Sequence, residues 1–252
     1  MIPTDDRGFL LGDGLFETML ALDGAVPLID AHLDRMAAGC VTLGLPPLDR
    51  SSARVLCLEA APAQGRAAVR LTLTAGSGGR GLERPEVSAP RLLATAAPAA
   101  PVLTPACLVI ARTCRNEGSP ASRLKTLAYL DNVLARAEAR AAGADEAVML
   151  NNAGHLACAA AANLFWIEKD RLLTPALTCG VLAGITRERV LAAARGLGVV
   201  VEEAVADAAR LNAAQGVFLT NSLIGVRPVS RLGARALEPH ALTRRLGEAV
   251  AL

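Results

Sequence analysis

The chain has 252 residues, of which 52% are apolar and 20% charged, a composition typical of a compact folded protein and not of a disordered one. Its formal net charge is +2 and aromatic residues make up only 2%, so neither a basic surface that tracks phosphates nor a platform for base stacking is expected. We therefore expect no nucleic-acid partner.

The six cysteines include no C-x-x-C pair and the three histidines are widely separated, which argues against a bound metal. Residues 92–111 are uncharged over about the length of a membrane span, but Pro98, Pro101 and Pro105 interrupt them and favour buried strands and turns. The N-terminus lacks a basic segment followed by an apolar one, so no secretory signal is predicted. These patterns predict a cytoplasmic protein without membrane contact.

Along the first half of the chain, the hydrophobic pattern predicts one helix and several strands. Apolar residues recur at helical spacing within residues 28–45, and Asp30 is the expected N-terminal cap of that helix. Residues 67–76 alternate apolar side chains with polar or small ones, as a half-buried strand does. Residues 91–97 and 106–114 are expected to be its neighbouring strands.

In the second half, strands and helices are predicted to alternate. A helix is expected at residues 127–142, closed by Gly143, because apolar residues again recur at helical spacing. Strands are expected at residues 146–151 and 155–168, with the turn N-N-A-G between them.

The polar segment 115–122, R-N-E-G-S-P-A-S, is the expected linker between two domains, because nothing in it favours a regular element. This places a small N-terminal α/β domain at residues 1–114 and a larger C-terminal domain at residues 123–252. The expected fold class is α/β (α+β) in two domains.

Several familiar catalytic motifs are missing from the sequence. The glycine-rich segment 76–81, G-S-G-G-R-G, lacks the G-K-[ST] ending of a phosphate-binding loop and is expected to be a mobile turn. There is neither a G-x-S-x-G elbow nor an H-E-x-x-H pair, so the usual hydrolase and zinc-protease signatures are absent. The chemistry must therefore depend on other residues.

Only two of the 26 basic residues are lysines. A lysine where arginine would serve any surface role suggests chemistry that needs a deprotonable amine, of which Schiff-base formation is the leading case. Lys169 sits in the charged stretch I-E-K-D-R, which favours an exposed hairpin tip. Lys125 precedes apolar residues at a helix entry, where partial burial would lower its pKa. The alternative is an ordinary surface lysine near a helix start.

A second feature fits the same chemistry. In L-A-G-I-T-R-E-R-V, residues 182–190, Gly184, Ile185 and Thr186 stand where a turn meets a helix, so backbone N–H groups and a hydroxyl can converge on a phosphate. The alternative is an ordinary threonine N-cap. A lysine combined with a phosphate site suggests pyridoxal phosphate as the cofactor.

These residues resemble the fold-type-IV pyridoxal-phosphate enzymes, the class IV aminotransferase family, which includes branched-chain and D-amino-acid aminotransferases and 4-amino-4-deoxychorismate lyase. The resemblance runs almost end to end through D-R-G-F-L-L-G-D-G-L-F-E-T, H-L-D-R-M, R-L-K-T-L-A-Y-L-D-N, A-N-L-F-W, L-A-G-I-T-R and T-N-S-L-I-G-V-R-P-V. It implies a small N-terminal domain, a C-terminal pseudo-barrel domain that binds pyridoxal 5'-phosphate, and a homodimer.

The resemblance also implies roles for individual residues. Lys125 matches the lysine that forms the Schiff base with the cofactor and later moves protons. Arg35 matches the arginine that pairs with the cofactor phosphate, and Ile185 and Thr186 match its backbone and hydroxyl ligands. Ser222 stands where the family places another small residue in contact with the phosphate.

Two further positions concern the cofactor ring. Tyr129 is expected to border it. Cys158 stands where the family has a glutamate that keeps the pyridine nitrogen protonated, and a cysteine cannot act as a comparable anion unless its own pKa is strongly lowered. The electron sink is therefore expected to be weaker.

A weak electron sink harms a transaminase more than a lyase whose product gains aromaticity, so the expected activity is release of pyruvate from 4-amino-4-deoxychorismate to give 4-aminobenzoate, a step toward folate. The alternatives are an aminotransferase acting on branched-chain or D-amino acids, and a non-catalytic binding module that keeps the fold.

Overall fold

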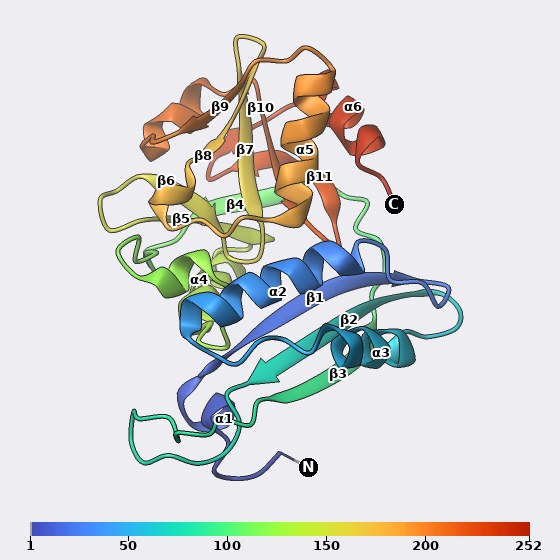
Figure 1. Ribbon diagram of the computed structural model, residues 1–252. Coiled ribbons are helices and arrows are strands. Elements are labelled where there is room, and N and C mark those ends of the chain that lie inside the picture. The colour runs from blue at the N-terminus through green and yellow to red at the C-terminus, as the bar shows by residue number, and fades with distance from the viewer. Residues whose placement is uncertain (1) are drawn as a thin grey trace. The chain divides into compact units, whose positions relative to one another are not determined.

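The computed structural model describes residues 2–252, and the chain folds as two compact units. The first unit runs to Ala100 and also takes in Leu124–Ala128. The second unit comprises Pro101–Arg123 and Tyr129–Leu252. In Figure 1 the first unit carries the blue to green elements that come first in the chain, and the second unit the green to red ones that follow.

The first unit is a three-stranded antiparallel sheet with helices on one face, as counted over residues 2–252. The strand order is β1-β2-β3. The elements are α1 (Arg7–Leu11), β1 (Gly14–Leu22), α2 (Ile29–Leu43), α3 (Arg50–Ala60), β2 (Arg66–Thr74) and β3 (Arg91–Pro98).

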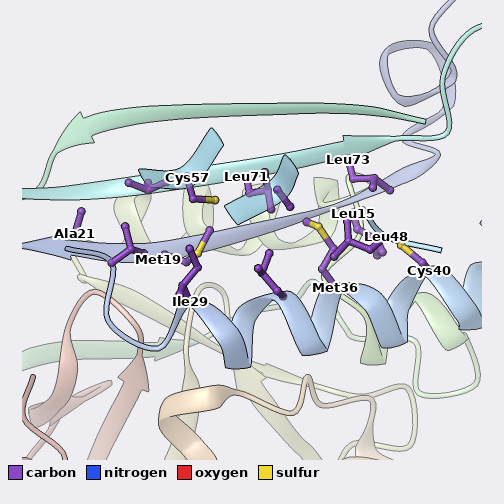
Figure 2. Close-up of a cluster of buried hydrophobic side chains, with 14 of the residues drawn as sticks. Leu15, Met19, Ala21, Ile29, Met36, Cys40, Leu48, Cys57, Leu71 and Leu73 are labelled. Carbon is purple, nitrogen blue, oxygen red and sulfur yellow. The ribbon is translucent and has the colours of Figure 1, made fainter. Parts of the chain in front are cut away.

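The core of the first unit lies between the sheet and the helices α2 and α3. Alternate residues of β1 and β2 face these helices, and Figure 2 shows Met19 and Leu71 among the buried side chains between strand and helix. Met36 and Cys40 approach the sheet from α2. Each fully buried side chain of this size contributes about 1.5–3 kcal/mol to folding, so this layer fixes how α2 lies on β1.

Helix α2 occupies the predicted segment, but its start differs from the prediction. The N-cap is Leu28, with φ +62°, and Asp30 lies inside the first turn. The prediction that Asp30 caps the helix is therefore wrong. Its carboxylate instead accepts a hydrogen bond from Arg54 of α3, which joins the two helices at the surface.

The second unit contains a nine-stranded sheet in the part of the chain that the structure describes. The order is β6-β5-β4-β11-β10-β7-β8-β9, and β12 pairs with β11. The strands are β4 (Ala106–Ile110), β5 (Glu146–Leu150), β6 (Leu156–Ala159), β7 (Asn163–Glu168), β8 (Arg171–Pro175), β9 (Val201–Ala204), β10 (Gly216–Asn221), β11 (Gly225–Leu232) and β12 (Arg235–Ala236). The helices are α4 (Leu130–Ala141), α5 (Ile185–Gly196) and α6 (Ala241–Ala249), with short 3-10 turns at Pro120–Arg123, Leu177–Cys179 and Ala208–Ala213.

The two ends of this sheet approach one another. Leu156 N, at one end of the strand order, donates to Ala206 O at 2.7 Å, and His155 forms a bridge with Asp207. Ala206 and Asp207 directly follow β9, the strand at the other end. The sheet therefore curls toward a barrel, as the resemblance implied.

Three strand predictions need correction. Residues 91–97 do pair with residues 67–76, but β4 joins the other sheet, where it lies parallel to β5 and β11. The single strand expected at residues 155–168 is two strands, β6 and β7, separated by a turn. Strand β3 is also largely exposed rather than buried, since it forms an edge of its sheet.

The observed units also differ from the predicted domain limits. The pairing of β4 brings residues 101–114 into the second unit. The expected linker belongs to that unit too, because Arg115 is buried and its N–H donates to Leu150 O at 2.8 Å. Over residues 2–252, no helix combines the length and the apolar character that a membrane crossing needs.

Candidate active site

Lys125 lies on a short segment that extends the sheet of the first unit beyond β1. Phe16 N donates to Lys125 O at 2.8 Å, and Thr126 forms an antiparallel bridge with Leu15. Leu15 faces the core under α2, so its neighbour Phe16 and the facing Lys125 point to the other side of the sheet. This pairing also explains why α4 begins at Leu130 and not at residue 127.

The Lys125 amine has an aromatic neighbour. Its Nζ lies 4.2 Å from the centroid of the Phe16 ring, and the guanidinium carbon of Arg70 lies 3.8 Å from the same centroid. Lys125 is partly buried, whereas Lys169 is exposed in the two-residue turn between β7 and β8. The structure thus confirms the predicted contrast in exposure between the two lysines.

Arg35 projects from α2 toward a buried carboxylate of β1. Its Nε donates to Oε1 of Glu17 at 2.8 Å, and a terminal nitrogen donates to Oε2 at 2.5 Å. Nδ1 of His32, one helical turn earlier, lies 2.7 Å from the same Oε2. Glu17 and His32 are each 1% exposed, so the position of Arg35 is set by charges inside the core.

The electrostatics of this network keep Glu17 ionised. Burial is the largest influence and raises the pKa of Glu17, but hydrogen bonds from Arg35 and His32 outweigh it and hold the pKa below the ordinary 4.5. The negative charge of Glu17 also affects the neighbouring Cys57. Burial, and after it this charge, raises the pKa of Cys57 to about 11.

In the second unit, the N-terminus of α5 lies where the sequence predicts it. Gly184 is the N-cap, and in the described part of the chain no side chain makes a capping hydrogen bond there. Thr186 is buried at the second helical position, so the alternative that Thr186 is a conventional N-cap is wrong. The first N–H groups of a helix have no partner within it and carry positive partial charge.

Asn163, the first residue of β7, connects this helix start to the sheet. Its Nδ2 donates to Leu182 O at 2.9 Å, just before α5. Across the ladder Asn163 faces Thr220 of β10. Thr220 is fully buried, and its hydroxyl has no hydrogen-bond partner among residues 2–252.

Asn221 makes the corresponding connection on β10. Its Nδ2 donates to Ala161 O at 2.9 Å, in the turn between β6 and β7, and its Oδ1 accepts from Leu223 N at 2.9 Å. The second bond closes the turn that contains Ser222. Residues 160–162, 182–186 and 221–224, here called the cradle, therefore meet at one end of the β7–β10 pair.

The cradle has the donor set that a phosphate group requires. It includes the N–H groups at the start of α5 and the side chains of Thr186 and Ser222, and nearby lies the buried Thr220 hydroxyl, which has no hydrogen-bond partner among residues 2–252. An uncapped helix start with converging hydroxyls is a general site for phosphate. The residues present thus fit the phosphate end of pyridoxal phosphate.

Cys158 lies in β6 opposite Met149 and is surrounded by small buried apolar side chains. Burial raises the pKa of the Cys158 thiol; the positive charge of Arg115 opposes this and the negative charge of Glu146 adds to it. The net shift is upward from 9.0, so the thiol is neutral at pH 7. Cys158 cannot provide an anion.

Tyr129 is the N-cap residue of α4 and is partly buried. Asn132, in the first turn of α4, donates its Nδ2 to Ala160 O at 2.7 Å and accepts from the buried Arg115 at 2.9 Å. The start of α4 is therefore tied to the same turn as the cradle. The segments that carry the predicted site residues of the second unit are thus linked by hydrogen bonds to this turn or to Asn163, which directly follows it.

Sequence reasoning missed five residues of this arrangement: Glu17, His32, Asn163, Thr220 and Asn221. Glu17 carried a detectable signal, because it is a charged residue at a core-facing position of an alternating strand. The two asparagines lie inside A-N-L-F-W and T-N-S-L, motifs of the family resemblance that imply no role for the amides. Nothing in the sequence marks Thr220.

The fold and the site together define the class of protein. A family model described as amino-transferase class IV matches residues 14–232, and the chain belongs to this family. The predicted family and the fold-type-IV architecture are thereby confirmed.

Particular relatives point to more than one activity. A putative branched-chain-amino-acid aminotransferase of Methanocaldococcus jannaschii is 30% identical over 254 residues, 96% of this chain and 88% of the relative. An aminodeoxychorismate lyase of Vibrio harveyi is 30% identical over 238 residues, 92% of this chain and 88% of the relative. The crystal structure of 4-amino-4-deoxychorismate lyase from Pseudomonas aeruginosa is similar with a TM-score of 0.89 and 32% identity, covering 98% of this chain and 93% of that one.

Proposed function

We propose that this protein binds pyridoxal phosphate covalently through Lys125 and releases pyruvate from 4-amino-4-deoxychorismate, leaving 4-aminobenzoate, a folate precursor. Relatives named as this lyase support the proposal, since they match nearly the whole chain at about the identity of any other relative described above. The neutral Cys158 is the observation that favours the lyase over a transaminase.

The proposal assigns the phosphate of the cofactor to the cradle. The N–H groups at Ile185 and Thr186, the Thr186 hydroxyl and Ser222 bind it there. The family resemblance implies the same ligand for Arg35. Tyr129 borders the ring, and Cys158 takes the position near the ring nitrogen. The uncapped start of α5 and the nearby Thr220 hydroxyl, which has no hydrogen-bond partner among residues 2–252, support this assignment.

When bound, pyridoxal phosphate supplies an electron sink for the carbon that carries the substrate amine. The Lys125 amine removes the proton from that carbon, the C–O bond to the enolpyruvyl group breaks, and the ring becomes aromatic. The proton then returns to the departing three-carbon fragment, which leaves as pyruvate. Substrate and products balance without a further reactant, and Lys125 acts as general base and then general acid.

Cys158 bears on the choice of reaction because a transaminase needs a long-lived negative charge on the cofactor. An anion beside the ring nitrogen stabilises that charge, and a neutral thiol does not. In the lyase the aromatic product supplies much of the driving force instead. A weak electron sink therefore costs the lyase less.

The test follows the two half-reactions separately. With 4-amino-4-deoxychorismate, the lyase releases pyruvate and 4-aminobenzoate in equal amounts while the absorption of the bound cofactor returns to its starting spectrum. With an amino donor alone, either L-valine or D-alanine, a transaminase converts the cofactor to its amine form. Conversion by a donor at a rate above that of pyruvate release contradicts the lyase proposal.

Covalent attachment is tested by borohydride reduction followed by digestion and mass spectrometry. The reduced pyridoxyl group is expected on the peptide containing Lys125. Lys169→Arg should label like the wild type, since Lys169 is exposed on a hairpin turn. Labelling on Lys169, or none with excess cofactor, contradicts the assignment, and the second result favours a non-catalytic module.

The aminotransferase remains the second candidate because the Methanocaldococcus jannaschii relative, with 30% identity over 96% of the chain, carries that name. The donor-only experiment decides between the two. The proposal includes a homodimer, as the resemblance implies, and a location in the cytoplasm, as the sequence pattern implies. Analytical ultracentrifugation measures the oligomeric state.

A further inference from the structure

We propose that Asn163 is a positioning residue that sets the start of α5 by packing against Gly184, so that affinity for the phosphate of the ligand depends on this contact. The inference rests on the proposed function, because it concerns the same cradle. It assigns a role to an amide that the proposed function leaves without one.

The contact leaves no room for a side chain at Gly184. A Cβ built on Gly184 would lie 2.0 Å from Oδ1 of Asn163 and 3.1 Å from its Cγ. The backbone of Gly184 has φ −78° and ψ 136°, an extended conformation open to every residue type. Glycine is therefore required here for space and not for its backbone freedom.

The other end of the same amide holds the preceding residue in place. Nδ2 of Asn163 donates to Leu182 O at 2.9 Å, so one side chain fixes two points of the turn that leads into α5. Asn163 is itself immobilised, since it is buried on a strand paired with β10 on one side and β8 on the other. Asn163 thus fixes the position of this turn relative to the central strands of the sheet.

The position of Gly184 decides where the N–H groups of α5 point. Gly184 O accepts the hydrogen bond of Glu188 N at 2.9 Å, so Gly184 forms part of the first helical turn. A shift of Gly184 carries with it the N–H groups of Ile185 and Thr186. Because charge-assisted hydrogen bonds need good geometry, a small displacement weakens all of them at once.

The test compares pyridoxal phosphate with pyridoxal, which lacks the phosphate, as ligands of the full-length protein. Gly184→Ala should weaken binding of pyridoxal phosphate by about tenfold or more and leave pyridoxal binding within about twofold. Asn163→Ala should weaken pyridoxal phosphate binding less. The double variant should bind no worse than Asn163→Ala, because removing the amide vacates the space that the new Cβ needs.

Thr174→Val is the matched control. Thr174 of β8 is fully buried, and its hydroxyl donates at 2.8 Å to the carbonyl of Leu164, the residue that follows Asn163, without a hydrogen bond to Gly184 or Leu182 among those of the described residues. This variant should lose thermal stability while keeping the wild-type ratio of the two dissociation constants. A general loss of packing is thereby separated from a displaced cradle.

Two outcomes would overturn different claims. If the wild type binds pyridoxal as tightly as pyridoxal phosphate, the phosphate site of the proposed function is wrong. If the wild type prefers pyridoxal phosphate but Gly184→Ala keeps that preference, this inference alone fails. Should Gly184→Ala not fold, Asn163→Leu takes its place: it is neutral and similar in size, loses the donor to Leu182 O, and is expected to reduce the preference by about threefold, whereas an unchanged preference would overturn this inference.

Discussion

The two units fix their functional side chains by opposite means. In the first unit Arg35 is held by an ionised glutamate and a histidine in the core, so its position depends on charge. In the second unit Asn163 and Asn221 hold the cradle with neutral amides. The stability of the ion pairs in the first unit therefore depends on pH, whereas that of the amide hydrogen bonds in the second unit does not.

The largest effect is expected at Lys125, where an arginine variant keeps the positive charge and removes the nucleophilic amine. Lys125→Arg keeps a cation beside Phe16 but removes the nucleophilic amine, so turnover should fall by at least about 1,000-fold. Lys169→Arg should leave turnover unchanged. Pyruvate release measures both, and a Lys125→Arg protein with a tenth of the wild-type rate would refute the role of the amine.

The next effect removes the charge at the centre of the first unit. Glu17→Gln leaves Arg35 and His32 without their carboxylate and should lower the free energy of unfolding by about 2–4 kcal/mol. Glu59→Gln, on the exposed side of α3, is the matched control and should cost less than about 0.5 kcal/mol. Denaturant unfolding measures both variants.

The pH dependence of stability also tests whether Glu17 is ionised in the first unit. The pKa of Glu17 is held below 4.5 in the folded protein, so its contribution to stability is complete above pH 4.5 and is lost as the pH falls through the folded value. The wild type should therefore lose stability on acidification more steeply than Glu17→Gln. Parallel curves below pH 4.5 would contradict an ionised Glu17.

An ion pair near the cradle tests whether the second unit also depends on charge. Arg187, at the third position of α5, is buried and donates to Glu203 at 2.6 Å, while the Glu203 side chain is 39% exposed. Because solvent weakens this pair, Glu203→Gln should cost only about 1 kcal/mol of unfolding free energy. A loss above 3 kcal/mol would mean that charge also braces the second unit.

The smallest effect is expected at Cys158. Since its thiol is neutral at pH 7, Cys158→Ala should leave the pH profile of pyruvate release unchanged and cost about 1 kcal/mol or less in stability. A change in the acid limb of that profile would show that the thiol takes part as an ion.

The sequence predicted those features that depend on local pattern. The helix start at Gly184, the burial difference between the two lysines and most strands follow from periodicity and turn chemistry along the chain. The family resemblance supplied the fold, because its motifs span nearly the whole chain.

What escaped prediction depends on contacts between distant segments. The placement of β4 beside β11 and the pairing of Lys125 with Phe16 join residues more than 100 positions apart in sequence, which no local pattern encodes. The roles of Glu17 and Asn163 likewise depend on partners contributed by other elements. Residue type alone identified a functional candidate only for lysine, because lysine is rare in this chain.

The hairpin that carries Lys169 has a practical consequence. Lys169 and Asp170 have φ +46° and +63°, a two-residue turn for which asparagine followed by glycine is better suited. Lys169→Asn should therefore be tolerated, and it would leave Lys125 as the only side-chain amine in the protein. Isotope-labelled lysine would then give a single resonance, through which the protonation of one residue can be followed directly in solution.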